Sequence, residues 1–202
     1  MTLQIVSGIS KPATTPPLSV YIRLKAKTLM DTYVDSIDKE ISGLGTVTIF
    51  GPNALLIDEI YLLRQKVSSG ETIMDPQGMA AFARELRSAG GDVNKIRLWW
   101  HSHHASSVFW SSQTDLKTIE SFGAQGATWM VSLVTNKSGE YLTRVDIYDP
   151  LRVVLDGLSL VTVADTDEAL MERVKAEIAT KVEVMSIPVV KIYSKRKRGR
   201  KK

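Results

Sequence analysis

The pattern of apolar and polar positions predicts a chain that mixes helices with strands. Four segments carry apolar residues at helical spacing: residues 25–38, 76–87, 112–122 and 165–181. Shorter apolar or alternating runs predict strands over residues 18–24, 44–50, 54–63, 95–100, 128–135, 141–148 and 153–163. Two glycines in Ser42-Gly43-Leu44-Gly45 predict a break after the first helix. Helices interspersed with hairpins favour the α+β class.

The length of 202 residues suits one domain with short extensions. Residues 1–17 are rich in proline and polar residues and predict a flexible N-terminal arm. The domain is expected over residues 18–185, followed by a basic tail over residues 186–202. No apolar run is long enough to span a membrane, and no secretory signal is recognisable. We therefore expect no membrane contact and a cytoplasmic protein.

Charge is distributed unevenly along the chain. The last eight residues, 195–202, contain seven Lys or Arg residues and no acid, so the net charge of +4 leaves −3 for the rest. A block of like charges predicts a disordered segment that contacts nucleic acid or an acidic protein. The chain contains no cysteine, so any zinc site must use histidine and carboxylate ligands.

The three histidines of the chain lie within four residues, where a predicted strand runs into a loop. His101 and His103 are two residues apart, so in a strand their side chains point the same way. Asp115, near the start of the next predicted helix, can supply a third ligand. Two histidines and one carboxylate with an open position are typical of a catalytic zinc site.

A hydrolase also needs a group that moves the proton of the attacking water. A carboxylate near the metal that does not bind it suits this role. The residues alone leave Glu40, Glu59 and Glu71 as alternatives.

The segment Trp100-His101-Ser102-His103, followed by Phe109-Trp110-Ser111 and Asp115, resembles the motif of the JAMM (MPN-type) zinc metallopeptidases. That motif is an upstream glutamate, then His-x-His, seven residues, serine, two residues and aspartate. The resemblance covers roughly residues 18–150 and implies an MPN (JAB)-like α+β domain, a mixed sheet flanked by helices, with zinc between a strand end and a helix start. It implies one zinc ion held by His101, His103 and Asp115. It also implies that Glu40, at the end of a helix, is the acid–base group.

The resemblance also implies a serine that stabilises the tetrahedral intermediate, and here the sequence departs from the motif by one inserted residue. Ser111 keeps the spacing from His103, whereas Ser112 keeps the spacing to Asp115. A fixed relation across the first helical turn favours Ser112, and both remain candidates. His104 stands where many members have proline.

We expect a zinc metallopeptidase that hydrolyses an amide bond in a protein or peptide. The resemblance implies a lysine-linked isopeptide bond to a ubiquitin-like protein as the substrate. The alternative is a non-catalytic scaffold of the same family, which binds nucleic acid or an acidic partner through its basic tail. The intact ligand set and Glu40 favour the enzyme.

Overall fold

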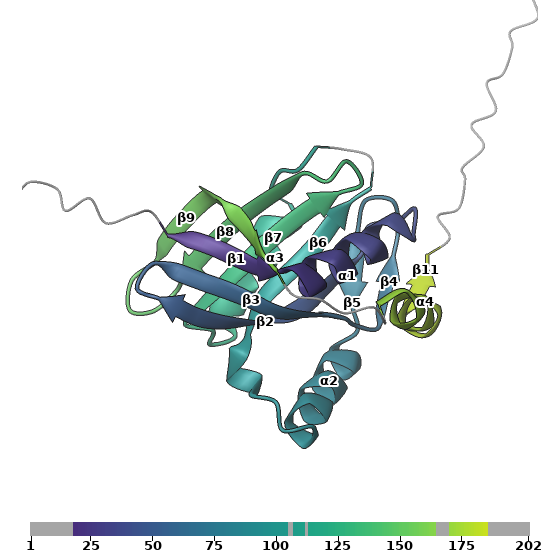
Figure 1. Ribbon diagram of the computed structural model, residues 1–202, viewed down its shortest axis with the longest axis horizontal. Coiled ribbons are helices and arrows are strands. Elements are labelled where there is room, and N and C mark those ends of the chain that lie inside the picture. The colour runs from purple at the N-terminus through teal and green to yellow at the C-terminus, as the bar shows by residue number, and fades with distance from the viewer. Residues whose placement is uncertain (1–17, 105–106, 112, 165–169, 186–202) are drawn as a thin grey trace, which may run out of the picture.

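The computed structural model describes residues 18–104, 107–111, 113–164 and 170–185, which form two sheets and four α-helices (Figure 1). The arm 1–17 and the tail 186–202 lie outside these residues. The large sheet has eight strands in the order β10 (Leu160–Val163), β1 (Ser19–Arg23), β3 (Ala54–Leu62), β2 (Ser42–Gly51), β6 (Ile96–His103), β7 (Trp129–Asn136), β8 (Tyr141–Ile147) and β9 (Val153–Leu158).

The large sheet is mixed and curls back on itself. β1 runs parallel to both β10 and β3, and β6 runs parallel to β7, whereas the other neighbours are antiparallel. The two edge strands, β9 and β10, are separated in the sequence by Ser159 alone, and β10 contacts β8. A single residue can connect opposite edges only if the sheet closes on itself like a barrel.

The expected α+β class with an MPN (JAB)-like domain is therefore wrong. The fold is predominantly β, and one barrel-like sheet takes the place of the expected sandwich of sheet and helices. The prediction of the fold failed at residues 153–163, which were expected to form a single strand. This segment divides into two strands at opposite edges, next to Gly157, whose φ is +65°. That backbone conformation suits glycine. It falls near the end of β9, where the register with β8 shifts, and the two strands are separated at Ser159.

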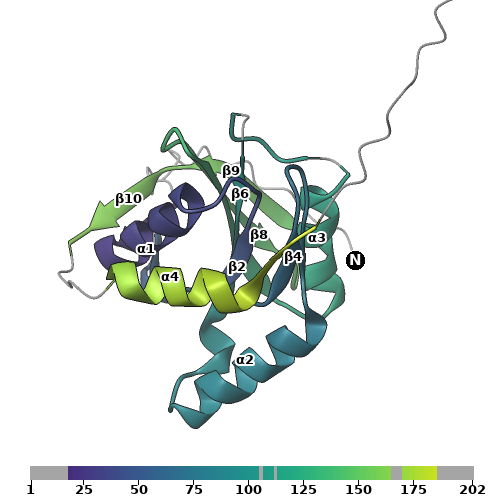
Figure 2. The ribbon, with the colours of Figure 1, turned by 90° about the vertical axis from the view of Figure 1, so that its right-hand side faces the viewer.

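The helices pack on both faces of the large sheet. α1 (Leu24–Asp35) and α4 (Leu170–Lys181) lie side by side on one face, and α3 (Asp115–Ala124) lies on the other (Figure 2). α2 (Pro76–Ser88) stands apart and has no fully buried residue. Alternation along β6 divides the core, since Leu98 and Trp100 face α1 and Trp99 faces α3.

A second sheet of three short strands was missed by the sequence pattern. It consists of β11 (Val182–Val184), β4 (Gln65–Val67) and β5 (Thr72–Met74), in that order. β4 and β5 form a hairpin, and β11 joins it from the end of α4. Strands of three residues are too short for a recognisable alternation. A 3-10 helix (Val93–Lys95) precedes β6.

The first helix does end before Ser42, as predicted, but Ser42–Gly45 do not form a turn, because these residues begin β2. Glycine is needed at positions 43 and 45 because the neighbouring strands lie too close for a side chain, and not because the chain turns there. A Cβ added at Gly43 would lie 2.0 Å from the carbonyl oxygen of Tyr61 and 2.6 Å from Nε1 of Trp100. The first helix ends at Asp35, earlier than predicted. In the part of the chain described, no helix is both long and apolar enough to cross a membrane.

Candidate metal centre

Strand β6 brings His101 and His103 to the same face of the large sheet, toward α3. β6 pairs with β2 on one side and with β7 on the other, so its backbone is fixed in the middle of the sheet. Ser102, between the histidines, points the other way. The side chains of His101 and His103 are buried, with 2% and 5% of their surfaces exposed.

Asp115 is the first residue of α3, and its carboxylate faces both imidazoles. The backbone N–H of Ser111 donates to its Oδ2 over 2.7 Å, and the hydroxyl of Thr114 donates to its Oδ1 over 3.3 Å. Carboxylates are favoured at the first turn of a helix, where backbone N–H groups are free. The helix start therefore orients the carboxylate toward the strand.

The three side chains converge into a group that could hold a metal ion, here termed the metal-binding group. The two Nε2 atoms of His101 and His103 are 3.3 Å apart, and Oδ2 of Asp115 lies 3.4 Å and 3.7 Å from them, respectively. Tetrahedral zinc bonds of about 2.0–2.1 Å place neighbouring ligand atoms roughly 3.3–3.4 Å apart. The residues fit a metal ion of this size, although the distances do not select zinc over other ions.

The outer nitrogens of the imidazoles differ in their surroundings. Nδ1 of His103 lies 3.2 Å from the carbonyl oxygen of Ser107, the usual arrangement that fixes the tautomer of a metal ligand. Nδ1 of His101 is buried and has no hydrogen-bond partner in the described part of the chain. The indole ring of Trp99 stacks on the imidazole ring of His101, with the two ring centroids 4.5 Å apart.

The electrostatics of the cluster favour a cation. Burial lowers the pKa of His101, which keeps this imidazole neutral. Burial alone would raise the pKa of Asp115, but hydrogen bonds to His101 and His103 outweigh it and hold that pKa well below its ordinary value. Burial also opposes protonation of His103, yet Asp115 raises the pKa of His103 overall. The positive charge of a protonated His103 would be replaced by that of a bound metal cation.

Glu40 lies beside these three residues but outside the metal-binding group. It does not end a helix, as the sequence suggested. It lies in the segment between α1 and β2. Ser42 is directly opposite His101 in the β2–β6 pair, and the N–H of Ser102 donates to the carbonyl oxygen of Ile41 over 2.8 Å. Continuing this register places Glu40 opposite His103 and on the same face.

The environment of Glu40 suits a proton-transfer group. Burial raises the pKa of its carboxyl group. The positive charge of His103 opposes this rise, the negative charge of Asp115 adds to it, and a hydrogen bond from the backbone of His104 opposes it. A raised pKa brings a carboxylate nearer to the neutral range, in which a general base works best.

The choice between the two serines stays open. Ser112 lies outside the described residues. Ser111 contributes backbone groups, because its N–H holds Asp115 and its carbonyl oxygen accepts from the N–H of Leu116. The preference for Ser112 therefore remains a prediction.

A groove of about 440 Å³ opens beside the cluster, with Glu40, His101 and Asp115 among its lining residues. Residues 70–74 of the β4–β5 hairpin form one wall, and residues 113–125 in and around α3 form the other. Phe109, whose ring centroid is 4.7 Å from that of His103, is 49% exposed, so it is not simply a packing residue. The sequence pattern missed the hairpin and therefore missed this wall.

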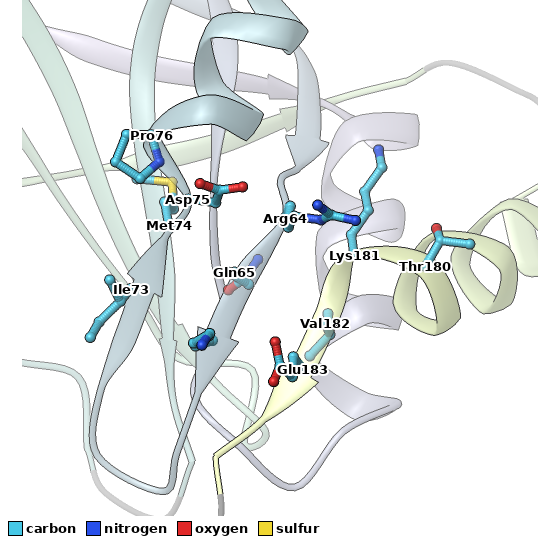
Figure 3. Close-up of a pocket in the computed structure, with 11 residues that line it drawn as sticks. Arg64, Gln65, Ile73, Met74, Asp75, Pro76, Thr180, Lys181, Val182 and Glu183 are labelled. Carbon is cyan, nitrogen blue, oxygen red and sulfur yellow. The ribbon is translucent and has the colours of Figure 1, made fainter.

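A second pocket of about 570 Å³ lies on the small sheet (Figure 3). Its lining comes from β4, β5, β11 and the adjoining ends of α2 and α4, and includes Arg64, Asp75 and Lys181. None of its lining residues is a histidine, and none belongs to the metal-binding group. The candidate site is therefore the smaller groove, which His101 and Asp115 line.

Comparisons with known proteins give a likeness of fold alone. No family model matches the sequence, and no curated protein matches it. Among solved structures, the chain is similar to protein DSY2949 from Desulfitobacterium hafniense, at 14% sequence identity and a TM-score of 0.51. The match covers 75% of this chain and 97% of that one. At this identity the match shows a similar fold and does not show a shared activity.

Proposed function

We propose that this chain is a zinc-dependent metallopeptidase that hydrolyses an amide bond. One observation carries the proposal: two histidines and one aspartate converge within the ligand distances of a tetrahedral ion, beside a groove that His101 and Asp115 line. Three protein ligands leave a fourth position for water or substrate, which distinguishes a catalytic site from a structural one. The motif resemblance to JAMM metallopeptidases supports the same assignment through its ligand spacing.

Each residue has a separate task in the proposed reaction. His101, His103 and Asp115 would hold the ion, which would supply Lewis acidity and lower the pKa of a bound water toward neutral. Glu40 accepts the proton of the attacking water and then donates it to the leaving nitrogen. Ser112 or Ser111 donates a hydrogen bond to the developing oxyanion, a contribution of about 3–4 kcal/mol in comparable sites.

The substrate in this proposal is a protein or peptide. The groove is open and bordered by backbone on one side, where β5 forms the edge of the small sheet. The JAMM-like motif implies a lysine-linked isopeptide bond, as in a conjugate of a ubiquitin-like protein. This choice of bond rests on the resemblance and not on the shape of the groove.

Metal analysis of purified variants tests the division of roles. We expect one zinc per chain in the wild type, loss of zinc in His103→Ala and Asp115→Ala, and full retention in Glu40→Gln. Hydrolysis of an Nε-acyl-lysine peptide should be lost in Glu40→Gln but kept in Glu59→Gln, which changes a carboxylate outside the groove. Loss of zinc from Glu40→Gln would show that Glu40 is a ligand and not the acid–base group.

A further inference from the structure

Gln65 is a fully buried polar side chain that the proposed reaction does not use. It lies on β4, between exposed Arg64 and exposed Lys66, and only 1% of its surface is exposed. A buried amide has a large desolvation cost unless its hydrogen-bonding groups are paired. Here the oxygen accepts two hydrogen bonds and the nitrogen donates two, so the amide is fully satisfied.

These hydrogen bonds join the β4–β5 hairpin to the first residue of β2. Oε1 of Gln65 accepts from the N–H of Ser42 over 2.9 Å, and Nε2 donates to the carbonyl oxygen of Ser42 over 2.8 Å. Oε1 also accepts from the hydroxyl of Thr72 over 2.8 Å, and Nε2 donates to the carbonyl oxygen of Leu63 over 2.9 Å. One side chain thus links both strands of the hairpin to the residue paired with His101.

The same hairpin holds the backbone of Glu40. The N–H of Glu40 donates to the carbonyl oxygen of Ser68 over 3.0 Å, and the N–H of Ser68 donates to the carbonyl oxygen of Glu71 over 2.8 Å. Ser68 follows β4 directly and is buried. The position of this carbonyl, and hence of Glu40, therefore depends on how the hairpin is attached to β2.

We propose that Gln65 is a positioning residue for Glu40. By fixing the β4–β5 hairpin against Ser42, it sets the distance between the Glu40 carboxylate and the metal-binding group. The inference rests on the proposed amide hydrolysis. Gln65 makes no hydrogen bond to β6, the strand that carries His101 and His103. Metal binding should therefore not depend on Gln65.

The test replaces Gln65 with methionine, which keeps the volume and removes all four hydrogen bonds. We expect normal zinc content and a kcat lower by about tenfold to a hundredfold, because small displacements of a catalytic group have large effects on rate. Lys66→Ala, on the same strand but with an exposed side chain, should leave kcat unchanged. Thr72→Val removes one of the hydrogen bonds to Gln65 and the contact of Thr72 with the Ser42 hydroxyl, both of which attach the hairpin to β2, and should lower kcat by about threefold to tenfold.

Two measurements separate positioning from a general loss of structure. In a Glu40→Gln background, Gln65→Met should change the residual rate of hydrolysis, measured at high enzyme concentration, by less than about twofold, since residues that act through one group are not additive. Hydrogen exchange at the amides of Glu40 and Ser42 should be faster in Gln65→Met, with no change at Trp100.

The outcomes distinguish this role from the proposed function. If Glu40→Gln abolishes hydrolysis while Gln65→Met and Thr72→Val behave like Lys66→Ala, the positioning role is wrong and the proposed function stands. If the wild type binds zinc but hydrolyses no amide, both are wrong. Should Gln65→Met fail to fold, Thr72→Val decides alone, and an unchanged kcat there overturns the role.

Discussion

At the scale of single residues, the metal-binding group depends on two local rules. Alternation along β6 directs His101 and His103 to one face, and the start of α3 presents Asp115 with its carboxylate held by a backbone N–H. Both rules act over a few residues, so the three ligands can be identified from spacing alone. The position of Glu40, 61 residues before His101, depends on the pairing of β2 with β6.

Serine substitutions should distinguish the two candidates for the oxyanion donor. We expect Ser112→Ala to lower turnover more than Ser111→Ala, by about a hundredfold or more, with little change in zinc content. The reason is that the Ser-x-x-Asp spacing of Ser112 to Asp115 is kept across the helix start. Turnover and metal content measured on both variants provide the check. A larger loss in Ser111→Ala would place the inserted residue at the helix start.

Gly43 should be intolerant of a side chain, because a Cβ would meet the backbone of β3 and the ring of Trp100. We expect Gly43→Ala to lower the free energy of unfolding by roughly 1–3 kcal/mol, the usual effect of overpacking. Gly51→Ala, in the same strand, is the control, since its nearest neighbour would lie 3.9 Å away. Denaturant unfolding of both variants gives the comparison, and equal stabilities would contradict the close approach.

At the scale of elements, α4 is attached to α1 through a polar contact beside the core. The hydroxyl of Tyr33 donates to Glu177, and Arg173 donates to the same carboxylate over 2.7 Å. Burial alone would raise the pKa of Glu177, but the hydrogen bonds from Arg173 and Tyr33 outweigh it and lower that pKa below its ordinary value. Because α4 leads directly into β11, its attachment also supports the small sheet.

The lowered pKa of Glu177 predicts how stability depends on pH. Its contribution is complete above the ordinary glutamate pKa and is lost as the pH falls through the lower pKa of the folded state. Glu177→Gln removes this dependence while keeping the shape of the side chain. Partly exposed ion pairs contribute about 0.2–1 kcal/mol, so we expect the wild type to lose roughly 1–3 °C more than the variant between pH 6 and pH 3.

Thermal unfolding across this pH range checks the prediction. All other titrating groups are common to the two proteins, so the difference between them reports on Glu177. Parallel Tm curves would show that the contact of α4 with Tyr33 contributes nothing to stability.

At the scale of the whole molecule, the basic tail and the rest of the chain carry opposite net charges. Residues 195–202, which lie outside the described part, carry seven positive charges, and the remaining residues sum to −3. The body by itself should therefore repel DNA, whereas the tail should attract it. Seven phosphate contacts would give a log–log salt slope near −6, and partial engagement reduces the expected slope to about −3 to −5.

Deletion of residues 195–202 should leave hydrolysis of a small amide unchanged and abolish DNA binding. The two activities are expected to be separate because the metal-binding group and Glu40 lie wholly within the described domain. Activity and a salt series of DNA affinity are measured on full-length and truncated protein. Reduced hydrolysis after truncation would contradict separability, and salt-insensitive binding would contradict electrostatic attraction.

The sequence by itself determined the features that depend on neighbouring residues. Most helices and the longer strands were predicted close to their observed bounds, because their apolar spacing extends over many residues. The convergence of His101, His103 and Asp115 was predicted from strand alternation and from the helix start, which also act between near neighbours. The choice of Glu40 came from the motif resemblance and not from its local sequence. Glu40 lies in the lining of the groove beside the metal-binding group, although the predicted helix end there was wrong.

Only the tertiary structure decided how distant segments meet. Gly43 and Gly45 suggested a turn in the sequence, and only the approach of Tyr61 and Trp100 shows that they are strand residues. The closure of the sheet through β9 and β10, which overturned the expected fold class, likewise depends on pairing between strands far apart in the chain. Gln65 is an ordinary polar residue in the sequence, and it is buried because the hairpin folds onto β2. Long-range pairing leaves no periodic signal along the chain, which is why these features could not be predicted.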